Sequence, residues 1–291
     1  MFSAIRSFGK RHPKLHALLV PAWPHFLRML WVVHKGISGR KPVTFKAGDH
    51  TIVLTPVGQI AEFMWCRAFE KEERDFAVRA MKPGMRVLNI GANAGLYTLI
   101  ASKIIGPTGD VHSFEPSSRN FDLLKKNIAL NQCKNVTANN MAVSNFQGQL
   151  SLHCDPLHPD FDGHFFVRRL PETPDPSLAP PMEIVPCTTV DEYWRAACGG
   201  EIKPVDFIVI DVEGAELSVF QGARQTFAAS PSVAMIMECT ENIDETGVFL
   251  AEMGFTFYTW DMNSSKLLPV KIGRGSFIAL KGLQATYPGN S

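Results

Sequence analysis

The chain lacks several features that would assign it to a specialised class of protein. No run of about 18 apolar residues is present, so no membrane-spanning helix is expected. Its six cysteines form no C-x-x-C pair and no secretory signal peptide is visible, so we expect reduced thiols and a cytoplasmic location. With 29 basic and 28 acidic residues the net charge is only +1, which argues against a nucleic-acid partner.

Acidic residues are also missing from the first 48 positions, where nine Lys and Arg are mixed with aromatic and aliphatic residues. This mixture suits an interfacial helix on anionic lipid and therefore a membrane-peripheral location. A helix packed on the domain, a dimer contact and a lid over the substrate explain the same composition. Three prolines between positions 13 and 24 divide the stretch into short pieces. We expect residues 1–60 to form an N-terminal extension that ends in a small hairpin.

From residue 61 onwards, short apolar runs alternate with amphipathic stretches, a pattern typical of an α/β fold with a mostly parallel central sheet. Strands are predicted over 87–90, 110–114, 136–141, 150–153, 207–210 and 233–237, with a C-terminal antiparallel pair over 255–260 and 276–280. Helices are predicted over 62–81, 95–105, 118–131, 188–196 and 216–227. The proline-rich segment 155–186 is predicted to be an irregular substrate-side loop.

The segment 87–99 combines a buried strand, a turn of small residues and the start of a helix. Gly91 and Gly95 omit the Cβ atoms that would block a ligand from approaching the backbone. Glu115 follows Gly91 by 24 residues, at the end of the next apolar strand. This spacing suits a carboxylate that accepts hydrogen bonds from ribose hydroxyls, so the unit predicts a nucleoside-cofactor site.

The glycines that a dinucleotide needs are absent from this turn. Counted from Gly91, the G-x-G-x-x-G fingerprint requires glycine at the positions of Asn93 and Leu96. The turn therefore fits NAD and FAD poorly. S-adenosylmethionine has no phosphate and so does not require the close backbone contact that a pyrophosphate needs. A dinucleotide and a turn without any ligand are the remaining interpretations of this segment taken alone.

Three ordered motifs resemble the FkbM-type methyltransferases, which are class I, Rossmann-like enzymes that use S-adenosylmethionine. The motifs are VLNIGANAGLYTL (87–99), SFEP (113–116) and IDVEGAEL (210–217). The resemblance implies a methyltransferase domain over 61–291 that acts on a small-molecule or glycan acceptor, through a hydroxyl of a sugar or natural-product scaffold. The alternatives are a peptide amide or carboxyl acceptor, or a non-catalytic cofactor-binding partner. The basic, apolar N-terminus adds a lipid-linked or amphipathic acceptor as a secondary hypothesis.

Asn89 departs from the first motif of this family, which usually has aspartate at that position to hold the methionine end of the cofactor. Asparagine keeps an acceptor atom but loses the negative charge. Two interpretations follow: Glu70, Asp211 or another acid supplies the charge, or the cofactor site is weakened. We expect binding to be retained, because Glu115 and the glycine turn remain.

Further cofactor contacts are predicted around this core. Asn93 belongs to the turn, and Tyr97 is placed to line it from the helix start. Asn140, Met141 and Ala142 follow the third core strand and are placed to border the adenine. Ordinary packing at the strand end explains these three residues as well.

Three residues are candidates for catalysis. Asp211 ends a buried strand at the ligand face and is predicted to position or deprotonate the acceptor, although capping of the next helix is a compatible role. Glu238, after the next strand, is a second candidate base or substrate ligand, and a strand-end salt bridge is its alternative. His164 is the candidate base in a loop rich in His and Asp. No metal site is predicted there, since the spacing matches no ligand pattern.

Overall fold

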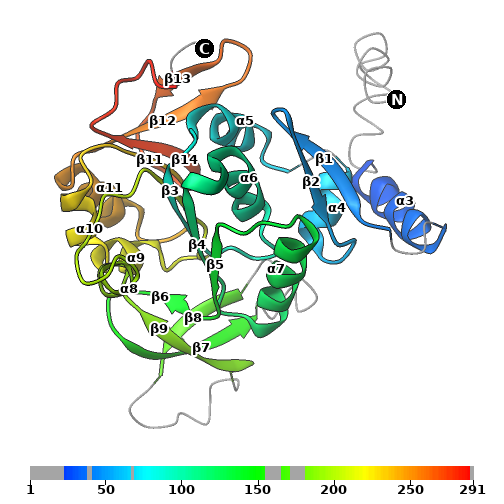
Figure 1. Ribbon diagram of the computed structural model, residues 1–291, viewed down its shortest axis with the longest axis horizontal. Helices are drawn as coiled ribbons and strands as arrows, with labels where there is room; N and C mark the ends of the chain where they lie inside the picture. The colour runs from blue at the N-terminus through cyan, green and yellow to red at the C-terminus, as the bar shows by residue number, and fades with distance from the viewer. Residues whose placement is uncertain (1–22, 38–40, 67–68, 155–164, 171–180, 289–291) are drawn as a thin grey trace.

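A twisted eight-stranded sheet forms the centre of the molecule (Figure 1). The structure is a computed structural model that describes residues 23–37, 41–66, 69–154, 165–170 and 181–288, without the side chains of 23–28 and 35. The strand order is β13-β12-β14-β11-β10-β3-β4-β5. The parallel strands are β3 (Arg86–Ile90), β4 (Asp110–Phe114), β5 (Val136–Asn139), β10 (Phe207–Ile210) and β11 (Val233–Cys239).

Three C-terminal strands extend this sheet in the antiparallel sense. They are β12 (Phe255–Asp261), β13 (Lys266–Pro269) and β14 (Gly275–Lys281). The predicted antiparallel pair is confirmed as β12 and β14, and β13 adds a further strand at the edge. The predicted α/β class with a mostly parallel sheet is therefore confirmed.

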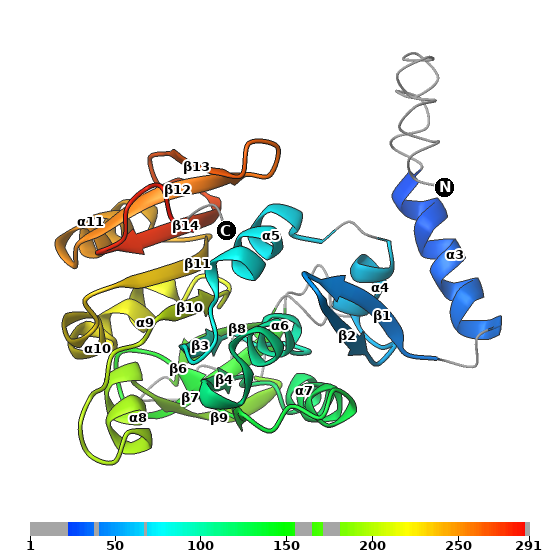
Figure 2. The same ribbon diagram turned by 45° about the horizontal axis from the view of Figure 1, so that its top comes forward.

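Helices cover both faces of the sheet, as Figure 2 shows. One face carries α5 (Lys71–Ala80), α6 (Leu96–Ile105) and α7 (Ser118–Leu130), and the short 3-10 helix η1 (Gly106–Thr108) follows α6. The other carries α8 (Val190–Ala197), α9 (Glu216–Gln221), α10 (Arg224–Ala229) and α11 (Ile243–Glu252). Neighbouring strand residues feed the two cores in alternation: Phe207 packs in the first and Ile208 in the second. This double burial explains why β10 is apolar throughout.

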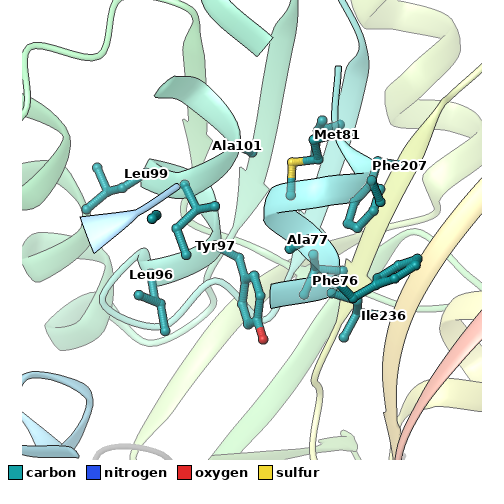
Figure 3. Packing of buried hydrophobic residues seen from close by; sticks show 14 of the residues in the cluster. Phe76, Ala77, Met81, Leu96, Tyr97, Leu99, Ala101, Phe207 and Ile236 are labelled. Atoms are coloured by element: carbon teal, nitrogen blue, oxygen red, sulfur yellow. The ribbon is translucent and has the colours of Figure 1, made fainter. Parts of the chain in front are cut away.

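Figure 3 shows the first core from close by, where Phe76 and Ala77 of α5 meet Phe207 and Ile236 of the sheet. The ring centroids of Phe76 and Phe207 lie 6.2 Å apart. Tyr97 stands at the margin of this cluster with its hydroxyl pointing away from the labelled apolar side chains (Figure 3). The core thus fixes α6 while leaving one polar atom available to the site.

A smaller sheet follows β5 and has the order β6-β9-β7-β8. Its strands are β6 (Ala142–Val143), β7 (Gly148–Cys154), β8 (Phe165–Arg169) and β9 (Glu183–Thr188). The prediction of an irregular segment over 155–186 is therefore wrong for β8 and β9. Pairing with β7 organises both strands, and the local sequence carries no sign of this non-local partner.

The N-terminal module consists of α3 (Trp23–Ile37), the hairpin β1 (Val43–Ala47) and β2 (His50–Leu54), and α4 (Gln59–Trp65). The predicted hairpin is confirmed, with Val43 opposite Leu54. Asn131 accepts from the Val53 N–H at 2.9 Å and donates to the Val53 carbonyl at 2.6 Å. Asn127 accepts from the Thr55 N–H at 2.8 Å. The amide of Asn127 on α7 and that of Asn131 at the C-terminal cap of α7 thus hold the outer edge of the hairpin. Within the described ranges, every helix is too short or too polar to span a bilayer.

Two helices predicted as continuous are broken. The stretch 62–81 divides into α4 and α5 because Glu70 adopts a left-handed conformation with φ of 35°. The stretch 216–227 divides into α9 and α10 around Gly222, where a Cβ would meet the Ser144 carbonyl oxygen at 2.2 Å. Asp191 of α8 caps the second piece by accepting the backbone N–H of Gln225 and Thr226 at 3.0 and 2.8 Å.

Candidate active site

The predicted site residues follow one row across the carboxyl edge of the sheet. Ile90 of β3 is in register with Phe114 of β4 and Ile210 of β10, and Ile210 is in register with Met237 of β11. The next residue of each strand is a predicted site residue, and the four are Glu115, Gly91, Asp211 and Glu238. Parallel strands in register therefore bring together side chains up to 123 positions apart in the chain, those of Glu115 and Glu238.

Gly91 lies where two strand exits come closest. Its φ is 83°, and a Cβ there would sit 1.7 Å from the Asp211 carbonyl oxygen. Only glycine tolerates both conditions, so this position fixes how near β3 and β10 lie at the site. Gly95 has a different duty: it precedes α6 with φ of 92°, and a Cβ there would meet Leu124 Cδ1 at 2.6 Å.

Glu115 is buried and already holds the turn. Its two carboxylate oxygens accept the backbone N–H of Asn93 at 2.8 Å and of Ser117 at 2.9 Å. Burial raises the pKa of the Glu115 carboxyl to about 7, against the opposing effect of these two hydrogen bonds. Each oxygen retains a further lone pair, so the carboxylate can still accept from ribose hydroxyls.

A cavity with about 590 Å³ of empty space, open solvent included, lies beside Glu115. Met141 and Ala142 line it, as the sequence predicts for the adenine side, and Phe165 and Val167 of β8 form a further wall. Asn140 does not line this cavity, because its amide donates to the carbonyls of Glu115 and Pro116, both at 2.9 Å. Asn140 therefore positions the Glu115 loop. Apolar walls with one carboxylate suit a nucleoside.

Gly91 also lines a second cavity, and the lining of this cavity is acidic. Glu70, Glu73, Asp211, Glu213 and Glu238 all line it, together with Asn89 and Tyr97. Arg274, from the segment before β14, is the one basic residue among the described residues that line this cavity. Five carboxyl groups against one guanidinium favour a cationic ligand, which the sulfonium and ammonium groups of S-adenosylmethionine provide.

Glu70 owes its place in this wall to the break between α4 and α5. Arg74 Nε donates to the Phe69 carbonyl at 2.9 Å and to the Glu70 carbonyl at 3.2 Å, which holds the corner. The Tyr97 hydroxyl donates to Glu70 Oε2 at 2.6 Å. Burial raises the pKa of Glu70 to about 7. Glu70 and Tyr97, each predicted separately to contact the cofactor, thus share one wall of the cavity.

Asp211 carries a polar atom that the described residues leave unsatisfied. Its Oδ1 is buried and has no hydrogen-bond partner among them. Burial, followed by the negative charges of Glu238, Glu213, Glu70 and Glu216, raises the pKa of the Asp211 carboxyl well above its ordinary value. A buried orphan acceptor in a ligand cavity points to a missing donor or cation. The residues present therefore fit S-adenosylmethionine.

Several residues that line the acidic cavity were not predicted from the sequence. Phe63 of α4 and Phe69 stack at 5.9 Å between ring centroids at the mouth of the acidic cavity. Arg274 and Ser276 enter from β14 and the segment before it. Ser276 could have been inferred from strand register, since it lies opposite Glu238. The aromatic pair carries no local signal, because only the break between α4 and α5 brings it there.

His164 lies outside the described residues. Among the residues that the structure does describe, no group of three or more His, Cys, Asp or Glu side chains is arranged to hold a metal ion.

Asn89 is buried and belongs to a chain of polar side chains. Its Nδ2 donates to Thr98 Oγ1 at 2.8 Å, and Thr98 Oγ1 lies 2.7 Å from Ser113 Oγ. With aspartate at position 89, both hydroxyls can rotate to donate in the opposite direction, so the chain accommodates an acid.

We expect Asn89→Asp to raise cofactor affinity by up to about tenfold, because a charge-assisted contact is stronger than a neutral one by roughly 1 kcal/mol. Isothermal titration calorimetry with S-adenosylmethionine measures the change. Asn145→Asp adds the same charge at an exposed site and is the matched control. Unchanged affinity in Asn89→Asp would mean that the acids of the cavity already supply the charge.

A family model and a curated relative that match this chain are both described as methyltransferases. The family model described as the methyltransferase FkbM domain matches residues 89–258, which is more than half of the chain. The methyltransferase sdnD of Sordaria araneosa is 26% identical over 183 residues, covering 57% of this chain and 70% of that protein.

Solved structures give lower similarity. A SAM-dependent methyltransferase from Aquifex aeolicus aligns over 72% of this chain and 88% of its own, with 17% identity and a TM-score of 0.36. A SAM-dependent O-methyltransferase from Thermotoga maritima aligns over 84% of this chain and 78% of its own, with 16% identity and a TM-score of 0.41.

Proposed function

Because the chain belongs to the FkbM methyltransferase family and is an S-adenosylmethionine-dependent enzyme, we propose that it methylates a hydroxyl oxygen on a sugar or natural-product scaffold. The observation that carries the proposal is the Asp211 carboxyl, whose buried Oδ1 has no partner among the described residues. It lies on the row between the turn and Glu238, in the wall of the acidic cavity. A base at this point suits an acceptor that must lose a proton.

Each group of residues has a proposed task. Glu115 accepts hydrogen bonds from the ribose, and Met141, Ala142 and Phe165 enclose the adenine side of its cavity. The acids of the second cavity orient the cationic end of the cofactor. When bound, S-adenosylmethionine supplies an electrophilic methyl group on a good leaving group. The protein therefore has to align the acceptor and exclude water more than it has to activate the donor.

The acceptor hydroxyl is proposed to donate its proton to Asp211 Oδ1, with Glu238 on the neighbouring strand holding the acceptor in place. Ionised Asp211 is required for this step. Burial, followed by the charges of its acidic neighbours, raises the pKa of this carboxyl, and a positive charge in the cavity lowers it, so cofactor binding favours the ionised base. The stacked Phe63 and Phe69 rings at the mouth offer an apolar surface to the face of a sugar or scaffold ring.

The test is a methyl-transfer assay with isotopically labelled cofactor and paired acceptors. Each pair contains a sugar or polyketide-type alcohol and its deoxy analogue, in which the candidate hydroxyl is replaced by hydrogen. We expect transfer to the alcohol only, giving a product that is stable to mild base. A base-labile methyl ester or an N-methyl product would contradict the proposal and assign the enzyme to carboxyl or amide acceptors.

A further inference from the structure

Helix α3 has an aliphatic face that no described residue covers. Met29, Val32, Val33 and Ile37 are between 47% and 83% exposed. At about 100° per residue, these four positions lie on the side of the helix opposite Trp31. Figure 2 shows α3 at the periphery of the molecule, attached through α4 and the β1–β2 hairpin. The face is therefore presented outward rather than toward the sheet.

The inner side of the same helix is firmly packed. Trp31 is 1% exposed, and its ring centroid lies 5.7 Å from that of Trp65 on α4. His34 stacks on both rings, at 5.9 Å from Trp31 and 5.2 Å from Trp65. This aromatic contact fixes the rotation of α3 about its axis, so the exposed face is a defined feature of the fold.

Isolated exposed aliphatic residues need no explanation, and Val248 on α11 is one such residue. A cluster of four on successive turns of one helix differs, because monomeric proteins rarely leave such contiguous apolar surface to water. The exposed face of α3 is therefore suited to a partner whose surface accepts aliphatic side chains.

Charge identifies the kind of partner. All 28 acidic residues of the chain occur at position 49 or later, whereas nine Lys and Arg precede it. The sequence of α3 itself contains Arg28 and Lys35 and no acid. Aliphatic side chains combined with an exclusively basic segment match a surface that is both apolar and negative. A nucleic acid would meet the positive charge but not the aliphatic face.

We propose that the outer face of α3 docks on the surface of an anionic phospholipid bilayer. The helix lies in the interface without crossing it: its 15 residues rise about 22 Å, less than the roughly 30 Å hydrocarbon core. Helix α4 connects this surface to the site, since Trp65 packs on α3 while Gln59, Ile60 and Phe63 line the acidic cavity. A docked α3 therefore leaves the mouth of that cavity one helix away from the lipid.

The experiment is vesicle co-sedimentation of the full chain. We expect the protein to pellet with vesicles containing about one third phosphatidylserine, to pellet weakly with pure phosphatidylcholine, and to be released by salt. Val32→Glu combined with Ile37→Glu should weaken binding to the anionic vesicles by about tenfold or more, because charge is excluded from the apolar boundary. Val248→Glu introduces one glutamate at an exposed valine of α11, away from α3, and should bind as the wild type does.

Three results would overturn the docking proposal. The wild type fails to bind anionic vesicles, or the α3 double variant binds them as well as the wild type. The third result is that sedimentation equilibrium finds the wild type to be a dimer and the double variant to be a monomer. This would assign the exposed face of α3 to a second copy of the chain. Val32→Ser with Val33→Ser provides a milder pair, and unchanged S-adenosylmethionine binding verifies the fold of every variant. Methyl transfer in solution is a separate readout, so the proposed function stands or falls independently.

Discussion

Asp211→Asn is expected to lower methyl transfer by about 10²- to 10⁴-fold, the range that loss of a positioned general base typically produces. Cofactor affinity should change far less. Burial, followed by the charges of neighbouring acids, raises the pKa of the Asp211 carboxyl and so favours its neutral form, which asparagine resembles in shape and charge. Single-turnover rates with labelled cofactor, together with calorimetric Kd values, separate the two effects.

The chain offers a matched control on the same strand. Asp206 precedes β10 at its amino end, where Oδ2 accepts the Arg86 N–H at 2.7 Å. Asp206→Asn makes an identical chemical change away from the ligand edge and should retain turnover within a fewfold of the wild type. If Asp211→Asn kept turnover while Glu238→Gln lost it, the base would be Glu238 and our assignment of roles would be reversed.

Cofactor affinity is expected to rise steeply between pH 6 and pH 8. Burial raises the pKa of both Glu115 and Glu70 to about 7, so both carboxyl groups ionise across this interval. Their ionised forms are the ones that accept ribose hydrogen bonds and attract a cation, so Kd should fall as pH rises. Each fully coupled group contributes up to about tenfold per pH unit below its pKa.

The stability of the ligand-free protein should fall as pH rises, whereas cofactor affinity should increase. A carboxyl whose pKa is higher in the folded state than in the unfolded state binds more protons when folded. Both groups therefore stabilise the fold at low pH, and this contribution is lost as pH rises from about 4.5 toward 7. The rise in melting temperature on adding S-adenosylmethionine should accordingly be larger at pH 8 than at pH 6, as differential scanning fluorimetry can measure.

Two comparisons assign the pH effect to its groups. Glu115→Gln should lose about 10²-fold in affinity and show a shallower pH dependence, because two hydrogen bonds to a charged acceptor are weakened at roughly 1.5 kcal/mol each. S-adenosylhomocysteine keeps the ribose but lacks the sulfonium charge, so it should retain the Glu115 contribution and lose part of the Glu70 contribution. A Kd that is flat from pH 6 to pH 8 for both ligands would refute this account.

The residues whose positions were predicted well are those that follow the end of a strand. Gly91, Glu115, Asp211 and Glu238 each directly follow a short apolar run or end one, and parallel strands share a carboxyl edge. The four-residue strand Phe207–Ile210 was predicted with its observed bounds, because burial on both faces leaves no polar interruption. Local patterns sufficed wherever register alone brought residues together.

Predictions from the sequence were wrong or incomplete where contacts between distant parts of the chain determine the structure. The left-handed corner at Glu70 depends on carbonyl contacts to Arg74, and its surroundings otherwise resemble a continuous helix. Phe165 reaches the cavity beside Glu115 only because β8 pairs with β7. Asn140 was expected at the ligand, yet its side chain turns to the Glu115 loop, a choice that strand periodicity does not resolve. In each case a partner distant in sequence determines the outcome.

The amide contacts between α7 and the hairpin bear on how the N-terminal module associates. An exposed strand edge presents unpaired N–H and C=O groups that recruit strands from other molecules, which is a route to aggregation. Asn131 occupies both polar groups of Val53, and Asn127 occupies the N–H of Thr55. Side chains of α7 and of its C-terminal cap thus take the place of a neighbouring strand and block edge-to-edge growth at β2.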